Sequence, residues 1–93
     1  MNRYELVVVI KPMLPDSVRN AVEEKITQLV SEGKGVVKST DTLGKRYLAY
    51  KIKGHTEGYY LIYDIEMPGT VLPTMSSSLR IMSQVLRFLI LKK

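Results

Sequence analysis

The sequence predicts an α+β fold in which four antiparallel strands carry two helices on one face. Three observations predict it. Four segments alternate their side chains with the period of two that a strand requires, two segments repeat apolar residues at helical spacing, and Gly or Pro separates them. The segment order is β-α-β-β-α-β, the ferredoxin-like arrangement. Because the chain has 93 residues, we expect a single domain over 1–93.

The first strand and the first helix follow from the N-terminal third of the sequence. Residues 3–10 alternate into two sets of side chains, which predicts a strand. Asp16 or Ser17 is expected to cap the helix that follows. Gly33 and Gly35 are expected to end it, because glycine accepts the left-handed conformation. The residues at helical spacing that predict its buried stripe are Val18, Ala21, Val22, Ile26, Leu29 and Val30.

A hairpin is expected in the middle of the chain. Its first strand is predicted over residues 36–52, with an interruption near residues 41–44. Its second strand is predicted over residues 59–67. The tract KGHTEG between them, residues 53–58, is expected to form the connecting loop because glycine flanks it.

The last third of the sequence predicts a short helix and a final strand. The Pro-Gly pair at 68–69 breaks the third strand, and Thr70 is expected to cap the helix. Pro73 then falls in the first helical turn, where its missing N–H is harmless. The final strand is predicted over residues 85–91. The apolar side of the short helix is expected to consist of Val71, Leu72, Met75 and Leu79.

The parity of side chains along the two hairpin strands assigns their aromatic residues. On the first of these strands, Leu48, Tyr50 and Ile52 are expected to face the core, on the same parity as Arg46. On the second, one set carries no charge and is expected to pack under the helices: Tyr59, Leu61, Tyr63, Ile65 and Met67. The three tyrosines in these two sets are therefore predicted to be core aromatics with hydroxyls near the rim.

The sheet face that the helices do not cover is predicted to carry an apolar patch. In this arrangement the first, third and fourth strands are neighbours, so their outward side chains meet. Arg3, Lys45 and Arg87 would edge the patch. Apolar side chains on an open sheet can reflect β-propensity alone, but six together favour a protein interface. The expected partner-binding residues are Val7, Val9, Tyr60, Ile62, Leu89 and Leu91.

Composition favours an acidic partner and gives no sign of an enzyme. The formal net charge is +5, and no acidic side chain follows Glu66. The chain has no cysteine, and its only histidine, His55, has no second ligand candidate nearby. No apolar run approaches the roughly 20 residues that span a bilayer. We therefore expect no catalysis, cofactor, metal, small-molecule substrate or membrane association.

One alternative is a free single-stranded RNA-binding module of the RNA-recognition-motif type. That motif has the same strand order and stacks bases on aromatic side chains of its central strands. The segment EGYYLIYD places Gly58 and Tyr59 where the motif has them. However, Glu57 replaces the leading basic residue, Leu61 replaces the second stacking ring, and parity turns Tyr59 inward. The match to this alternative is therefore weak.

Four stretches of the sequence resemble the bacterial small-subunit ribosomal protein six family. The second strand resembles its signature of a glycine, a basic pair and Leu-Ala-Tyr, and the resemblance covers nearly the whole chain. The stretches are RYELVVVIKP, GKRYLAYKIK, EGYYLIYDIEMPG and LRIMSQVLRFLILKK. The chain departs from the family pattern at Tyr47 and Lys51, and its second helix is neutral.

The resemblance implies a structural constituent of the small ribosomal subunit, in the cytoplasm or in an organelle. It implies binding to the central domain of small-subunit rRNA in a pair with ribosomal protein eighteen. Arg46 is expected to emerge at the end of the sheet, whereas Lys45 could be merely solvated and Arg80 could complement a helix dipole. Residues near the C-terminus are expected to form a positive rim with no acid nearby. The candidate rRNA-binding residues are Arg3, Lys45, Arg46, Arg80, Arg87, Lys92 and Lys93.

Overall fold

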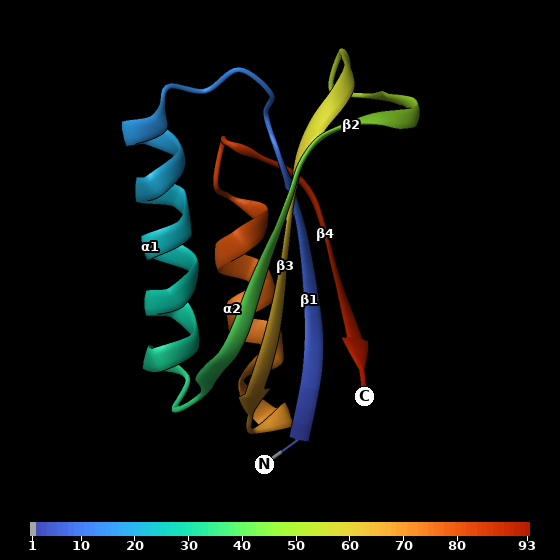
Figure 1. The fold of residues 1–93 in the computed structure, drawn as a ribbon. Coiled ribbons are helices and arrows are strands. Elements are labelled where there is room, and N and C mark those ends of the chain that lie inside the picture. The colour runs from blue at the N-terminus through green and yellow to red at the C-terminus, as the bar shows by residue number, and fades with distance from the viewer. Residues whose placement is uncertain (1) are drawn as a thin grey trace.

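The computed structural model describes residues 2–93, and over them it confirms the ferredoxin-like α+β fold. Four antiparallel strands pair in the order β2-β3-β1-β4. Both helices lie on one face of this sheet (Figure 1). The elements are β1 (Asn2–Ile10), α1 (Asp16–Glu32), β2 (Val36–Ile52), β3 (His55–Met67), the 3₁₀ turn η1 (Gly69–Val71), α2 (Leu72–Arg80) and β4 (Val85–Lys92).

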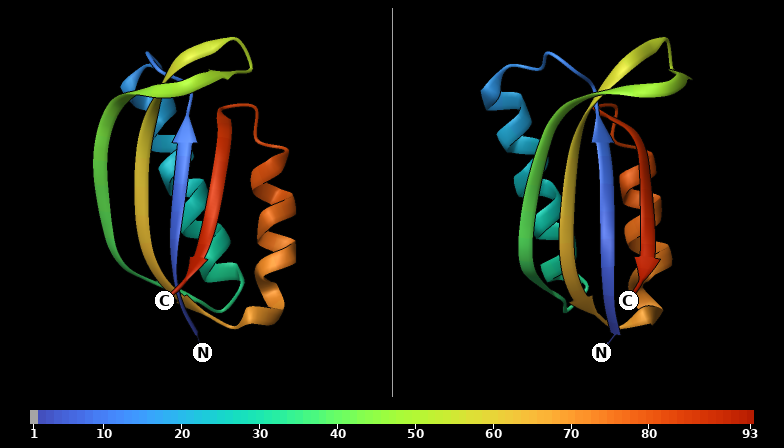
Figure 2. Two further views of the ribbon diagram at one scale, coloured as in Figure 1. Left: turned by 90° about the vertical axis from the view of Figure 1, so that its right-hand side faces the viewer. Right: turned by 45° about the vertical axis from the view of Figure 1, so that its right-hand side comes forward.

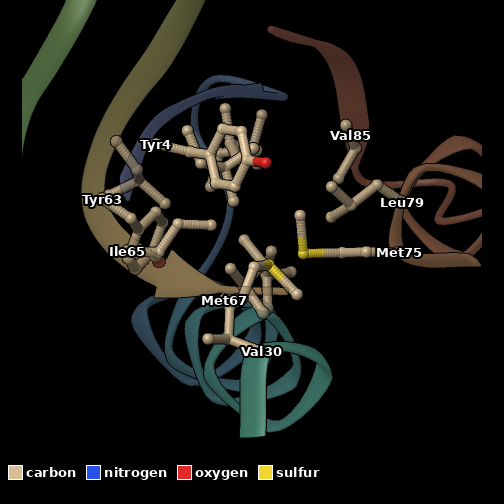
Figure 3. Close-up of a cluster of buried hydrophobic side chains, with 14 residues drawn as sticks. Tyr4, Val30, Tyr63, Ile65, Met67, Met75, Leu79 and Val85 are labelled. Carbon is tan, nitrogen blue, oxygen red and sulfur yellow. The ribbon is translucent and has the colours of Figure 1, made fainter. Parts of the chain in front are cut away.

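The core lies between the two central strands and the helices (Figure 3). The cross-strand pairs Leu6↔Tyr63 and Val8↔Leu61 place alternate side chains of β1 and β3 on the helix side. The inward set predicted for residues 59–67 is confirmed, with Tyr59 half-buried at its edge. The helices contribute the buried side chains of Val22, Ile26, Val30, Met75 and Leu79.

The ends of α1 differ from the expectation. Its N-cap is Pro15, and no side chain within residues 2–93 caps it, because the Asp16 carboxylate instead accepts a hydrogen bond from Arg19. At the other end Gly33 is the C-cap, as predicted, but its φ is −82°, and Lys34 takes the left-handed conformation with φ 62°. Gly35 is explained by close packing, since a Cβ there would lie 2.7 Å from Cβ of Met67.

The start of α2 differs in the same way. Thr70 lies in η1 and does not cap α2; the N-cap is Val71, without a side-chain hydrogen bond from the described residues. Pro73 does lie in the first turn, as predicted. On the apolar side of this helix Met75 and Leu79 are buried, and Val71 and Leu72 are half-buried against the core.

The interruption predicted near residues 41–44 is a β-bulge inside a continuous strand. Thr42 pairs with Leu61 and Gly44 with Tyr60, so Leu43 is an extra residue in β2. Gly44 has φ 79°, a conformation that glycine adopts without strain. One extra residue inverts the side-chain parity of the residues that follow it, up to the next register shift between Tyr47 and Ile52.

The inward assignment of residues 46–52 on the second strand is therefore wrong. Beyond the bulge, Arg46 pairs with Gly58 on the face away from the helices. Leu48 lines a hollow on that face together with Val9, and Tyr50 is 66% exposed. Tyr50 is thus not a core aromatic, whereas Tyr59 and Tyr63 are.

The connection between β2 and β3 is tighter than the predicted six-residue loop. Ile52 pairs with His55, so only Lys53 and Gly54 make the turn. Their φ values of 49° and 82° are both positive, as in a type I′ hairpin turn. We call residues 44–58 the arm. The arm extends past the ends of the helices and bends across the open face, above β1 and toward β4 (Figure 2).

Candidate protein and nucleic-acid interfaces

The open face, which is the face of the sheet away from the helices, brings the predicted apolar patch together. Val7 pairs with Ile62 on β3 and with Leu89 on β4, so these three side chains form one row. Tyr60 lies one row toward the arm, and Leu91 one row toward the chain termini. Leu89 and Leu91 are 42% and 45% exposed. The helices leave this apolar surface uncovered.

Val9 belongs to the same face but is buried by the arm. A Cβ on Gly58 would collide with Cγ1 of Val9 and lie 3.5 Å from Cδ2 of Leu48, so these side chains meet over the glycine. A hollow of about 200 Å³ lies between the arm and the sheet, lined by Leu48, Tyr50 and Ile52 among others. Sequence parity missed these lining residues. Gly44 inside a strand pattern was the signal that could have found them.

Basic side chains gather where the arm meets the start of β4. Arg80, Arg87 and Lys53 line one depression there. Nζ of Lys53 donates to the carbonyl of Val85 at 3.4 Å, and Nη1 of Arg87 donates to the hydroxyl of Tyr50 at 3.5 Å. Two of the predicted rRNA-binding residues therefore lie together, and Lys53 joins them. In the sequence, Lys53 stands beside Gly54, which could have indicated a tight turn at the tip of the hairpin. The flanking glycines predicted only a loop over residues 53–58.

The basic pair at the base of the arm divides between its two faces. Nζ of Lys45 lies 3.7 Å from Oε2 of Glu57, on the side that continues the helix-facing surface. Arg46 is exposed on the opposite side and donates a hydrogen bond to the carbonyl of Lys45 at 3.1 Å. Arg46 does emerge from the sheet, but toward the open face.

The expectation that the C-terminal positive rim has no acid nearby is wrong. Nη2 of Arg3 and Nζ of Lys93 lie 2.8 Å and 3.1 Å from Oδ2 of Asp64. The hydrogen bond from Lys93 holds the pKa of the Asp64 carboxyl below its usual value, and Arg3 acts in the same direction. Asp64 lies on β3, between β1 and the outer strand β2, so inspection of the chain after residue 66 could not reveal it.

The seven candidate basic residues therefore do not form one site. Arg80 and Arg87 lie at the arm end of β4, and Arg3, Lys92 and Lys93 lie at its other end. Lys45 and Arg46 lie on the arm. Within residues 2–93 there is no group of three or more His, Cys, Asp or Glu side chains that could hold a metal ion. In the same range no helix is long and apolar enough to cross a membrane.

Comparisons of this chain with a family model, with individual proteins and with a solved structure all match the same family. A family model described as ribosomal protein S6 matches residues 3–92. The small ribosomal subunit protein bS6 of Moorella thermoacetica is 37% identical over 90 residues, which cover 97% of this chain and 92% of that protein. The bS6 protein of Dictyoglomus turgidum is 36% identical, with 97% and 93% covered. The crystal structure of 30S ribosomal protein S6 from Thermotoga maritima superposes with a TM-score of 0.88 at 26% identity, covering 99% of this chain and 87% of that one.

Proposed function

The chain belongs to the ribosomal protein S6 family, whose members are constituents of the small ribosomal subunit, and on that premise we propose a pair of contacts for it. It binds the central domain of small-subunit rRNA, and it does so together with ribosomal protein eighteen. The observation that carries this proposal is the apolar open face, bordered by basic side chains at the arm. An apolar surface suits a protein, and a basic border suits phosphate.

The apolar patch supports a protein partner. Val7, Ile62 and Leu89 form a row on the face that the helices leave uncovered. A partner that covers this row gains roughly 25 cal/mol per Å² of apolar surface removed from water, before the costs of association. Leu48, which belongs to the arm, extends the surface at one end. We assign the six residues of the patch to this partner, with Val9 acting through the arm that covers it.

The basic groups support contact with RNA phosphates. Arg46, Arg80 and Arg87 have no acidic partner within 4 Å in the part of the chain that the structure describes, so we give them the main role. Arg3 and Lys93 already bind Asp64, and Lys45 binds Glu57. These three side chains can contact phosphate only if they share or exchange their acidic partner. The exposed Lys92 is left with a peripheral contact.

The geometry disfavours the free single-stranded RNA-binding module. Its stacking ring would be Tyr59, which is half-buried on the helix side. The guanidinium carbon of Arg19 lies 4.6 Å from the centre of that ring and occupies its face. A base would have to displace the arginine before it could stack there.

A binding titration with a central-domain rRNA fragment tests the proposed function. We expect the chain and ribosomal protein eighteen together to bind the fragment more tightly than either protein alone. The double substitution Arg46→Gln and Arg87→Gln should weaken this binding and flatten its salt dependence by about two units, one for each phosphate that is no longer neutralised by an arginine.

The matched control removes two charges elsewhere. Lys25→Gln with Lys34→Gln changes two exposed side chains, one on α1 and one just after it, and neither belongs to the arm. It should leave the salt dependence close to that of the wild type. If the pair of proteins does not bind the fragment at any salt concentration, the proposed function is wrong. If both double variants behave alike, only net charge matters and the arginine assignments are wrong.

A further inference from the structure

The arm holds an aromatic ring outside any packing. Tyr47 is 84% exposed, whereas Tyr4 and Tyr63 are buried in the core. Aromatic side chains ordinarily bury most of their surface and contribute heavily to cores and interfaces. The ring of Tyr47 does neither within the described chain, so its apolar faces are available to a ligand.

The position of Tyr47 separates it from the apolar patch. Tyr47 pairs with Glu57 and Lys45 pairs with Tyr59, so these side chains continue the helix-facing side of the sheet. Arg46 and Gly58 pair on the other side, where Leu48 and Val9 line one hollow. Tyr47 therefore projects from the outer side of the arm, the side opposite to Arg46.

The arm that carries the ring is rich in basic side chains. Between Gly44 and Gly58 the basic side chains are Lys45, Arg46, Lys51 and Lys53, and the only acidic side chain is Glu57. An exposed ring among cations is the combination with which proteins bind unpaired nucleotides. The ring stacks on a base, and the cations bind the adjacent phosphates.

We infer that Tyr47 is a stacking platform for an unpaired base of the bound rRNA, with Lys45 exchanging Glu57 for a flanking phosphate. The inference rests on the proposed function and gives it a contact to a base in addition to contacts with phosphates. A protein partner is the less suitable occupant, because residues that anchor protein interfaces lie in desolvated pockets and Tyr47 stands on a protruding arm.

Two substitutions separate the ring from the hydroxyl. In the presence of ribosomal protein eighteen, Tyr47→Phe should bind the central-domain rRNA fragment within about twofold of the wild type. Tyr47→Leu keeps apolar bulk but removes the π face, and it should bind about tenfold more weakly or worse, as expected when one base no longer stacks. Because the side chain is exposed, both variants should keep the denaturation midpoint of the wild type.

An introduced indole reports the contact directly. The chain has no tryptophan, so Tyr47→Trp places a single indole on the arm, and its emission can be excited selectively over that of the remaining tyrosines. Its emission should be quenched by the rRNA fragment and left unchanged by a fully paired RNA duplex of the same length or by ribosomal protein eighteen alone. Gln28→Trp, on the exposed side of α1, is the matched control and should show no quenching.

The outcomes distinguish this inference from the proposed function. If the wild type does not bind the fragment at all, the proposed function fails. If the wild type binds and Tyr47→Leu binds equally well, the stacking inference alone is wrong. If the indole responds to ribosomal protein eighteen before RNA is added, the outer side of the arm is a protein contact, and the inference is also wrong.

Discussion

The two faces of the sheet carry similar apolar side chains, but those on the helix side are buried more completely than those on the open face. On β3, Leu61 is fully buried under the helices, and its neighbour Ile62 is half-buried on the open face. Both are large, aliphatic and central in the sheet. The difference comes from what the chain places over them, two helices on one side and only the arm on the other. Apolar residues at alternate positions thus predict that both faces are buried, but they do not predict whether this chain or another protein buries each face.

The largest expected effect is on the free energy of unfolding, and it tests the difference in burial between Leu61 and Ile62. Leu61→Ala should lower the free energy of unfolding by about 2–5 kcal/mol, because it leaves a cavity in the core. Ile62→Ala, one residue along, should lower it by less than about 1 kcal/mol, because that side chain is only half-buried. Denaturant titration of the isolated chain measures both. Equal losses would show that the open face is part of the folded core.

A smaller effect tests how the arm covers one end of the open face. Gly58→Ala should cost about 1–3 kcal/mol, because its new methyl group collides with the side chain of Val9. If this collision is the cause, adding Val9→Ala should recover part of the loss, so that the double variant is more stable than the two single losses predict. Strict additivity would mean that the arm does not pack on Val9.

The smallest effect concerns the other end of the open face, where Asp64 binds Arg3 and Lys93. These contacts lower the pKa of Asp64 in the folded chain, so its carboxylate stabilises the fold above its unfolded pKa. That contribution is lost as the pH falls through the lowered folded pKa. Asp64→Asn should therefore be modestly less stable at pH 7, and the difference should shrink below about pH 4. A difference that grows in acid would contradict the ion pairs.

Local patterns in the sequence predicted most of the fold. The period of two on residues 3–10 and 59–67 and the helical spacing around Ile26 depend only on neighbours along the chain, so these strand faces and the centre of the buried stripe could be predicted, although Ala21 in that stripe is exposed. The helix caps could not be predicted as well, because Asp16 and Thr70 are common capping residues that the chain uses otherwise.

The candidate site was harder to predict because it depends on register. The extra residue Leu43 inverts parity, the pairing shifts again after Tyr47, and Leu48 and Tyr50 line a hollow on the open face. Asp64 reaches Arg3 across a strand pair, and Lys93 through the fold of the C-terminus. Neither relation is visible in the order of residues. By contrast, the row of Val7, Ile62 and Leu89 depended only on parity within regular strands, and the structure brings those side chains together.

One calorimetric titration tests most directly the claim that the open face is completed by a partner. Ribosomal protein eighteen is titrated into the wild type, into Ile62→Asp and into Gln28→Asp, which adds the same charge on the exposed side of α1. A carboxylate at position 62 would be buried without a partner on docking, so Ile62→Asp should remain folded and bind roughly 100-fold more weakly or worse. Gln28→Asp should bind within about twofold of the wild type. Wild-type affinity for Ile62→Asp would contradict this claim and place the interface elsewhere.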